Sequence, residues 1–331
     1  MNTELLIKDQ TYQPQNGVGV IYLAGGCFWG MERLMQVIPG VVGTTCGYAN
    51  GITTSPTYKA VCSGTTSARE TVRVEYQKDQ VSLDALLFMF FKVIDPTVKD
   101  QQGHDVGSQY QTGIYYIDEE AKKIIERIIT VEKKRTQPFY VEIKSLENFY
   151  DAEDYHQDYL IKNPQGYCHI NLQEINTAKQ MIVDPGQYPK PEADKIKKAL
   201  NDKQYQVTQA NATEAPFNNE YFQNMEKGIY VDIVTGEPLF TSKDKYLSNC
   251  GWPSFARSFD DNTLVYKNDK TAGMLRTEVR SRSGDSHLGH VFTNDPESPS
   301  KTRYCINSAA LRFIPLVEME AQGYGYLISM I

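Results

Sequence analysis

Hydrophobic and polar positions follow two periods over the first half of the chain. Apolar runs and strict alternation are typical of strands, whereas apolar residues recurring every three or four positions are typical of helices. Strands are predicted over residues 18–24, 71–76, 112–117 and 139–146, and helices over 31–38, 83–94 and 119–134. Because strands and helices follow each other in turn, residues 1–172 are expected to form an α/β domain, an α+β sandwich with helices packed on a sheet.

The pattern changes after residue 172. Residues 173–204 are rich in proline and charge, with one short helical stretch at 192–200, and are predicted to be a linker. Beyond it, short β-type runs such as GIYVDIV, NTLVYK and GHVFT are separated by Gly, Pro and Asn-Asp signals. Residues 205–331 are therefore expected to form a mainly antiparallel, all-β domain. The two halves share no repeat, which indicates a fusion of two different folds.

Length and composition agree with a multidomain globular protein. A chain of 331 residues with 40% hydrophobic and 23% charged residues is long enough for about two folded domains. The net charge is −7 and the basic residues are scattered, so nothing favours nucleic-acid binding. No apolar run is long enough to span a membrane. The first residues lack a signal-peptide pattern, so we expect a cytoplasmic protein, or one of the cell envelope or exterior if a leader has been removed.

Six cysteines carry the candidate chemistry. No two of them have the C-x-x-C spacing of a thioredoxin-type motif or a zinc ribbon, and six are too few for a disulfide-stapled scaffold. Some of these thiols are therefore candidates for catalysis and the others for packing. The six are Cys27, Cys46, Cys62, Cys168, Cys250 and Cys305.

Cys27 stands in the run GGCFWG, residues 25–30, between a predicted strand and a predicted helix. The two glycines allow an unusual turn, and a thiol at a helix start is expected to favour the thiolate because of the helix dipole. A buried structural cysteine is the alternative. The aromatic neighbours Phe28 and Trp29 point instead to a nucleophile whose target is small and apolar.

GGCFWG resembles the signature of peptide methionine sulfoxide reductase A. The resemblance continues in order through SPTYKAVCSGTTSARETV (55–72), QQGHDVGSQYQTGIYY (101–116), FYDAEDYHQDYL (149–160) and NPQGYCHI (163–170). It covers nearly all of the first domain. It implies that Cys27 is the nucleophile, that Phe28 and Trp29 enclose the substrate methyl group, and that Cys168 is the resolving thiol.

The same resemblance assigns the polar groups of the first site. Glu70 matches the acid that protonates the sulfoxide oxygen, Tyr58 and Tyr110 match the hydroxyls that bind this oxygen, and Asp105 matches their polar support. A thiol that attacks a sulfoxide needs a proton delivered to oxygen, and the resulting sulfenic acid condenses readily with a second thiol. Taken alone, the acid and the tyrosines would be ordinary surface or packing residues. We expect structural roles for Cys46 and Cys62, and a capping or core role for His156.

The second domain resembles methionine sulfoxide reductase B across about residues 205–331. The resemblance rests on CGWPSF (250–255), RTEVRSRSGDSHLGHVF (276–292) and RYCINSAALRFIP (303–315). It implies a nucleophile at Cys305 and a resolving thiol at Cys250. It further implies a methyl-binding indole at Trp252, oxygen-holding and proton-relaying groups at His287, His290 and Asn307, and a cation at Arg303 that favours the Cys305 thiolate.

The second domain departs from this pattern at two places. Many relatives bind a structural zinc through two C-x-x-C pairs, whereas the corresponding stretches here, VDIVTGEPLF and RSRSGDSHLGH, contain no cysteine. We therefore expect a zinc-free domain, since two histidines three residues apart are little evidence for a metal. The usual Asp after HVF falls on Asn294, where either Asp295 substitutes for it or the neighbouring histidine has an altered pKa.

Together the two resemblances imply a bifunctional enzyme that reduces methionine sulfoxide in proteins. The first domain would take the S epimer and the second the R epimer, because oxidation makes the sulfur a stereocentre. We expect no bound cofactor, recycling of the disulfides Cys27–Cys168 and Cys250–Cys305 by thioredoxin, and a monomer. A thiol peroxidase and a non-catalytic redox sensor are the alternatives.

Overall fold

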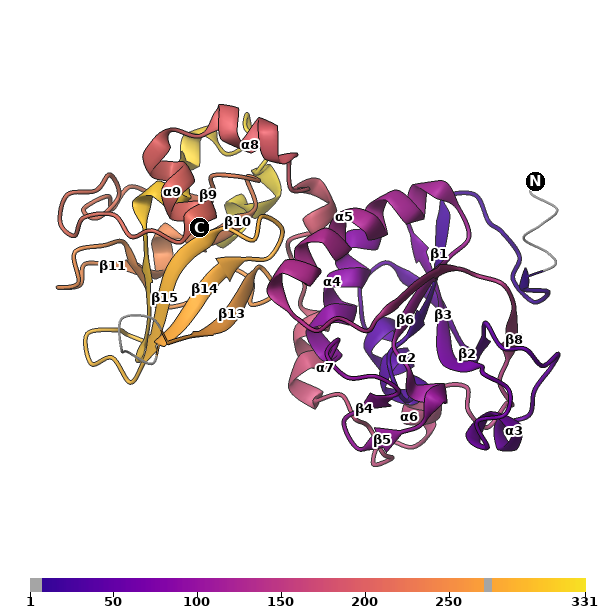
Figure 1. The fold of residues 1–331 in the computed structure, drawn as a ribbon. Helices are drawn as coiled ribbons and strands as arrows, with labels where there is room; N and C mark the ends of the chain where they lie inside the picture. The colour runs from indigo at the N-terminus through magenta and orange to yellow at the C-terminus, as the bar shows by residue number, and fades with distance from the viewer. Residues whose placement is uncertain (1–7, 271–275) are drawn as a thin grey trace. The chain divides into compact units, whose positions relative to one another are not determined.

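The computed structural model describes residues 8–270 and 276–331 and divides the chain between Asp184 and Pro185 into two compact units (Figure 1). The stretch 173–204, predicted to be a linker, falls partly in each unit. Its first part contains most of helix α7 (Leu172–Lys179) and belongs to the first unit, and its second part contains helix α8 (Ala193–Ala199) and belongs to the second.

The first unit is built on a six-stranded sheet with the order β7-β6-β1-β3-β2-β8. Strands β6 and β7 are parallel, and the other neighbouring pairs are antiparallel. The strands are β1 (Val18–Ala24), β2 (Val41–Ala49), β3 (Arg69–Gln77), β6 (Gly113–Tyr116), β7 (Glu142–Ser145) and β8 (Phe149–Asp151), with a separate pair β4 (Gln101–Gln102) and β5 (Asp105–Val106). The helices are α2 (Phe28–Gln36), α3 (Tyr58–Cys62), α4 (Leu83–Val93), α5 (Glu119–Arg135), α6 (Tyr159–Lys162) and α7 (Leu172–Lys179).

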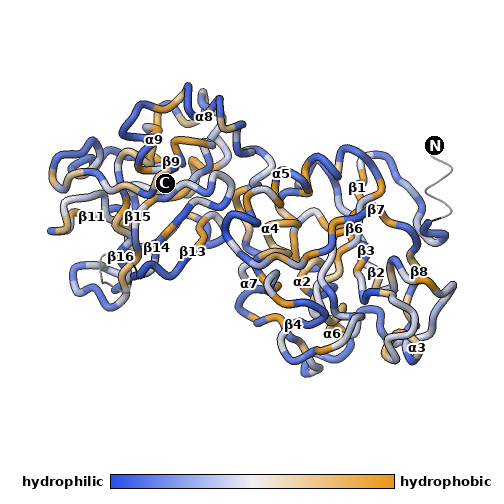
Figure 2. Tube along the Cα trace, viewed as in Figure 1, coloured by the Kyte–Doolittle hydropathy of each residue, from blue (hydrophilic) through white to orange (hydrophobic). Residues whose placement is uncertain are grey.

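Alternation along β1 divides the core of this unit between the two faces of the sheet. Ile21 and Leu23 belong to the large cluster that includes the buried residues of α2, α4 and α5. Val20 and Tyr22 belong to a smaller cluster on the other face. Helix α4 is apolar around most of its circumference, as Figure 2 shows, and its residues 83–91 are all buried. The predicted α/β sandwich is therefore confirmed, although strands β2 and β8 were not predicted as such.

The second unit contains a three-stranded sheet, β10-β9-β17, and a six-stranded sheet, β11-β12-β16-β15-β14-β13. The paired strands are antiparallel, which confirms the predicted fold class. The strands are β9 (Gly228–Asp232), β10 (Pro238–Thr241), β11 (Lys245–Tyr246), β12 (Ser254–Phe255), β13 (Leu264–Asp269), β14 (Arg276–Ser281), β15 (His287–Thr293), β16 (Thr302–Ile306) and β17 (Leu311–Pro315), and the helices are α8 (Ala193–Ala199) and α9 (Asp202–Ala210). Within the described ranges, no helix has the length and apolar character that a membrane crossing would need.

Buried carboxylates join the two cysteine-free stretches that were considered above as the places of a zinc site, 231–240 and 280–290. Asp232 is fully buried and accepts hydrogen bonds from the hydroxyls of Ser281 at 2.8 Å and Ser286 at 3.0 Å. Glu237 is also fully buried and accepts from Arg282 Nη2 at 2.7 Å and from the Ser283 amide at 3.0 Å. A buried acid is tolerated where several donors surround it. These carboxylates therefore link the β9–β10 turn to the β14–β15 turn.

We predict that Asp232→Ala destabilises the second unit by about 3 kcal/mol, because it leaves buried hydroxyl and amide donors without an acceptor. Urea unfolding followed by fluorescence measures the effect. The chain has two tryptophans, so a Trp29→Phe background leaves Trp252 as the reporter of the second unit. Asp194→Ala, at an exposed position in the same unit, is the matched control. Equal stability of the two variants would contradict the linking role of Asp232.

Candidate functional sites

The turn between β1 and α2 places Cys27 at the start of a helix. Gly26 has φ of +86°, and a Cβ there would lie 2.6 Å from Gln102 Cβ, so only glycine fits this turn. Cys27 is the N-cap residue of α2 and is 6% exposed. The sequence predicted a helix from residue 31, whereas the observed helix begins at Phe28. The thiol therefore stands directly at the amino end of the helix.

Glu70 lies against the same helix end. It comes from β3, which pairs with β1, and its Oε2 accepts a hydrogen bond from the Phe28 amide at 3.2 Å. Its Oε1 is buried and has no hydrogen-bond partner among the described residues. Burial raises the pKa of Glu70 to about 8, despite the amide that favours the carboxylate. At neutral pH Glu70 is therefore a buried carboxylic acid with a proton to give.

The expectation of a thiolate at Cys27 is wrong for this site. Burial, followed by the neighbouring Glu70 carboxyl, raises the pKa of the thiol well above its ordinary value. Contacts with the backbone of Trp29 and Gly30 at the helix start act in the opposite direction but are outweighed. Cys27 and Glu70 are thus both protonated at neutral pH, and the reaction must move a proton as the sulfur attacks.

Aromatic side chains form one wall beside Cys27. Phe28 is buried and Trp29 is partly exposed, with ring centres 6.3 Å apart. Trp29 stacks on Tyr159 at 3.8 Å and donates from Nε1 to His156 Nδ1 at 3.2 Å. His156 is 1% exposed and also packs on Phe28. It therefore holds the two aromatic rings in place, and no motif pointed to its contact with Trp29.

The two predicted hydroxyls lie close to the same acid. Tyr58, at the start of α3, and Tyr110 are half-buried, and burial raises the pKa of both. A hydrogen bond with Cys62 raises the pKa of Tyr58 further, and the charge of Glu70 raises the pKa of both hydroxyls. Asp105 also acts on Tyr110 and accepts a hydrogen bond from Tyr167 at 3.0 Å. Glu70 thus acts electrostatically on Cys27, Tyr58 and Tyr110, and Asp105 acts on Tyr110 and Cys27.

Cys168 lies beside the first turn of α2. A Cβ on Gly30 would stand 3.3 Å from Cys168 Sγ, so the absence of a side chain at Gly30 leaves room for this sulfur. The thiol is half-buried and donates to the Ile170 carbonyl at 3.2 Å. Cys46 is fully buried against the Phe28 carbonyl, and Cys62 is exposed at the end of α3. Of these three thiols, Cys168 is the one packed against the catalytic helix from outside the sheet.

The second unit brings two thiols into direct contact. Cys250 Sγ and Cys305 Sγ are 3.1 Å apart and both are free thiols. Cys250 also accepts a hydrogen bond from Ser248 Oγ at 3.0 Å. The contact with Cys305 lowers the pKa of Cys250, and the same contact raises the pKa of Cys305. Arg303 lowers the pKa of Cys305, as predicted. The contact with Cys250 and burial raise it more, so Cys305 is a thiol that shares its proton with Cys250, and not the predicted thiolate.

Strand register explains how this site is assembled. Cys305 on β16 pairs with Ser254 on β12 and with His290 on β15, and His290 pairs with Glu278 on β14. Directly opposed residues in antiparallel strands project from the same face. These side chains therefore form one row across the sheet. His287, at the start of β15, binds Glu278 Oε1 through Nδ1 at 2.6 Å.

The carboxylate partner of His290 differs from the expected one. Asp269 Oδ2 on β13 lies 2.8 Å from His290 Nε2. Asp295, the predicted substitute, instead accepts a hydrogen bond from Arg303 Nε at 2.5 Å, and Asn294 adopts φ of +60° in the turn. Burial lowers the pKa of His290 although Asp269 partly offsets it. A residue that no motif indicated therefore orients this histidine.

A strap formed by residues 211–217 holds Trp252. The indole Nε1 donates to the Glu214 carbonyl at 3.1 Å and the ring is partly exposed. The Glu214 amide donates to Asn307 Oδ1 at 3.1 Å, while Asn307 Nδ2 donates to the Leu288 carbonyl at 3.0 Å. The Glu214 carboxylate accepts from the Ser308 and Ala309 amides. Asn307 and Glu214 thus position the indole relative to the end of β16.

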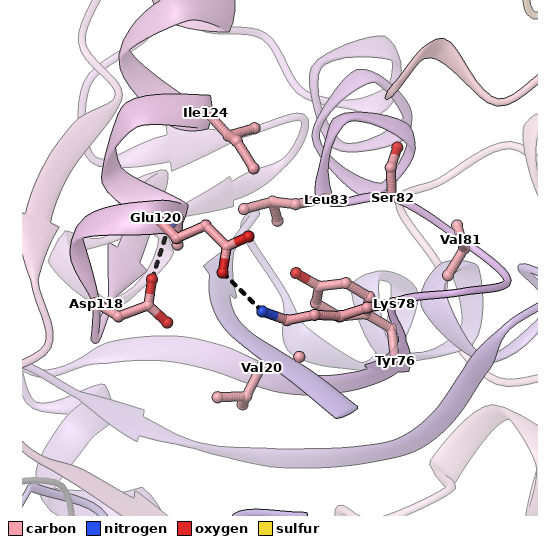
Figure 3. Close-up of a pocket in the computed structure, with 11 residues that line it drawn as sticks. Val20, Tyr76, Lys78, Val81, Ser82, Leu83, Asp118, Glu120 and Ile124 are labelled. Atoms are coloured by element: carbon pink, nitrogen blue, oxygen red, sulfur yellow. Dashed lines mark hydrogen bonds and ion pairs between the residues drawn. The ribbon is translucent and has the colours of Figure 1, made fainter. Parts of the chain in front are cut away.

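A cavity of about 150 Å³ in the first unit lies among Gly19, Tyr76, Lys78, Asp118 and Glu120, and Figure 3 shows Lys78 paired with Glu120. None of the predicted site residues lines it, so it is separate from both thiol sites. Among the residues described by the structure, no three His, Cys, Asp or Glu side chains gather in a way that could hold a metal ion.

Comparison with known proteins gives a matching family model for each unit. A family model described as peptide methionine sulfoxide reductase matches residues 19–185, and a model described as the SelR domain matches residues 200–315. Among solved structures, the chain is similar to reduced Mxr1 from Saccharomyces cerevisiae, with 36% identity over 50% of this chain and 97% of that chain and a TM-score of 0.45. It is also similar to methionine sulfoxide reductase A of Corynebacterium diphtheriae, with 38% identity. That match covers 48% of this chain and 81% of the other, with a TM-score of 0.43. A further match is Mxr1 from Saccharomyces cerevisiae in complex with Trx2, with 25% identity. That match covers 46% of this chain and 91% of the other, with a TM-score of 0.32.

We predict that Glu70→Gln makes the first unit more stable than the parent above about pH 5. The folded pKa of about 8 exceeds the unfolded value of 4.5, so the native state holds the proton more tightly and the parent loses stability as pH rises from 4.5 to 8. The difference should reach about 3 kcal/mol at pH 7. Urea unfolding of both proteins in a Trp252→Phe background, from pH 5 to 9, measures it. Glu147→Gln, at an exposed position, is the control, and a difference that does not grow with pH would refute the buried acid.

Proposed function

The chain belongs to the peptide methionine sulfoxide reductase family, with a SelR domain after the first domain, and on that premise we propose that each unit reduces one epimer of methionine sulfoxide through its own pair of thiols. The first unit acts on the S epimer and the second on the R epimer. The observation that carries the proposal is that a buried thiol lies beside a proton donor in the first unit and that two thiols touch beside a histidine in the second.

In the first unit, Glu70 supplies the proton that the sulfoxide oxygen needs. Glu70 Oε1 has no hydrogen-bond partner among the described residues and is available to the oxygen, and we infer that Tyr58 and Tyr110 donate to the same atom. As the Cys27 sulfur attacks, Glu70 gives its proton to the sulfoxide oxygen and takes up the Cys27 thiol proton. The S–O bond of the substrate breaks, and its OH group passes to the Cys27 sulfur. Methionine leaves, and Cys27 becomes a sulfenic acid. Phe28 and Trp29 enclose the methyl group and exclude water from the attack.

Cys168 then converts the Cys27 sulfenic acid into a disulfide. Cys168 attacks the sulfur of the Cys27 sulfenic acid, the sulfenic oxygen leaves as water, and a Cys27–Cys168 disulfide forms. The position of Cys168 beside Gly30 supports this role, because it lies next to the helix that begins after Cys27.

In the second unit, the two sulfurs exchange a proton before attack. The Cys305 proton can pass to Cys250 across the 3.1 Å contact, which frees the Cys305 sulfur to attack the substrate. His290 donates from Nε2 to Asp269, which leaves Nδ1 as an acceptor that can take the proton from Cys250 and relay it to the sulfoxide oxygen. The Cys305 sulfenic acid then condenses with Cys250 and releases water. Trp252, held by the Glu214 carbonyl, offers its ring to the methyl group.

Both disulfides require a dithiol reductant before the next turnover. We expect thioredoxin to supply it, because exchange through a mixed disulfide needs a protein dithiol of sufficiently low potential. The substrates are oxidised proteins or peptides, and the partly exposed indoles of Trp29 and Trp252 support access by a side chain presented on a polypeptide.

We predict that Cys27→Ser abolishes reduction of the S epimer and spares the R epimer, and that Cys305→Ser does the reverse. Each variant removes the sulfur that accepts oxygen in one unit only. Turnover of epimerically pure substrate with thioredoxin, and in parallel with dithiothreitol, measures both effects. Cys46→Ser, a buried thiol without a proposed chemical step, is the matched control. If either nucleophile variant retained both activities, the assignment of the nucleophiles would be wrong.

We predict that Asp269→Asn lowers kcat for the R epimer by roughly tenfold to a hundredfold, because His290 loses the charged partner that orients it. Reduction of the S epimer should be unchanged. Asp202→Asn, at an exposed position in the same unit, serves as the control. An Asp269→Asn enzyme with parental activity on both epimers would show that Asp269 has no role in the reaction.

A further inference from the structure

The imidazole of His169 lies in a groove formed by the glycines of the GGCFWG run. A Cβ on Gly30 would stand 3.0 Å from both His169 Cε1 and His169 Nδ1, and a Cβ on Gly26 would stand 3.4 Å from His169 Nε2. The same Gly30 Cβ would stand 3.3 Å from Cys168 Sγ. Gly26 and Gly30 therefore admit both the imidazole and the neighbouring thiol to the surface of the turn and helix that carry Cys27.

One hydrogen bond sets the tautomer of this histidine. His169 Nε2 lies 3.0 Å from the Gly25 carbonyl, which can only accept, so Nε2 carries the ring proton. Nδ1 is then an acceptor, and it is buried with no hydrogen-bond partner among the described residues. Burial lowers the pKa of His169, while Asp105 acts in the opposite direction, and the ring remains neutral at physiological pH. His169 Nδ1 is therefore a basic nitrogen that lies beside Gly30 of the GGCFWG run and has no hydrogen-bond partner among the described residues.

The segment that carries Cys168 is held on both sides of the thiol. On one side Tyr167 donates to Asp105 at 3.0 Å, and on the other His169 binds the Gly25 carbonyl. Cys168 itself donates to the Ile170 carbonyl at 3.2 Å, and burial raises the pKa of its thiol. A thiol in this state needs a base before it can attack, and the other ionisable groups that act on Tyr167 and His169 are the acid Asp105 and the thiol Cys27.

We propose that His169 accepts the proton of Cys168 during formation of the Cys27–Cys168 disulfide, through Nδ1, while its Nε2 bond to Gly25 keeps the resolving segment on the catalytic helix. This inference rests on the proposed function of the first unit, because it needs a sulfenic acid at Cys27. Sulfoxide reduction itself does not require His169, so the two steps can be separated.

The step is balanced without a further reactant. The S–H bond of Cys168 breaks as its proton moves to His169 Nδ1, and a new S–S bond forms to the Cys27 sulfur. The S–O bond of the sulfenic acid breaks, and the leaving hydroxide takes up a proton and departs as water. Cys27 in its sulfenic state is reduced as Cys168 is oxidised, and the proton on His169 returns to solvent.

The test is a single turnover of the purified S epimer by the full-length protein without reductant. Methionine release reports the first step, and trapping with dimedone followed by thiol alkylation and mass spectrometry reports sulfenic acid and disulfide. His169→Gln keeps an amide donor near the Nε2 position but has no basic nitrogen, and His169→Ala removes both. His104→Gln, at an exposed position in the same unit, is the matched control.

We expect His169→Gln to release methionine at the parental rate but to form the disulfide at least roughly tenfold more slowly at pH 7, with sulfenic acid accumulating. The disulfide rate of the variant should recover as pH rises, because hydroxide then replaces the base. A parental disulfide rate in His169→Gln with a slow rate in His169→Ala would overturn the base and leave only a docking role. Parental rates in both variants would overturn the inference entirely. Absence of methionine release in the parent would instead refute the proposed function.

Discussion

The hydrogen bond from the Phe28 amide to Glu70 ties the proposed proton donor of the first unit to the helix that begins after Cys27, the proposed nucleophile. A carboxyl group at a helix start would ordinarily be ionised, since amides and the helix dipole favour the anion. Burial outweighs that preference and keeps the acid protonated at neutral pH. The same burial keeps Cys27 protonated. The first unit is therefore organised around two neutral acids, which in our proposal provide the sulfur and the proton that a sulfoxide requires.

The second unit solves the same chemical problem with a different division of roles. Its two thiols already touch, so one sulfur can serve as the proton acceptor for the other before substrate arrives. The first unit keeps its second thiol beside Gly30, outside the buried site, and its acid is a carboxyl group rather than a histidine. An antiparallel row across β12, β16, β15 and β14 replaces the strand–turn–helix connection that forms the first site. The shared chemistry therefore does not depend on a shared fold.

Much of the first unit's secondary structure and the turn before Cys27 could be predicted from the sequence, because periodicity and the glycine motif are local signals. The periodicity located α4, α5 and the strands β1, β3, β6 and β7 of the first unit, and GGCFWG located the turn in which Gly26 has a positive φ. The remaining contacts depend on distant partners. Nothing near His290 in sequence indicates Asp269, and nothing near Trp252 indicates the Glu214 carbonyl. The thiolate predicted at Cys27 was wrong because the helix start is visible in the sequence whereas the extent of burial is not.

We infer that each unit reduces methionine sulfoxide with its own two thiols, which become a disulfide within that unit. The most direct measurement is the stoichiometry of the reduced, full-length protein with excess racemic methionine sulfoxide and no reductant, followed by mapping of the disulfides by mass spectrometry. Two methionines released per chain, with disulfides Cys27–Cys168 and Cys250–Cys305 and with Cys46 and Cys62 still free, is the predicted result. One methionine per chain, or a disulfide between a cysteine of the first unit and one of the second, would contradict it.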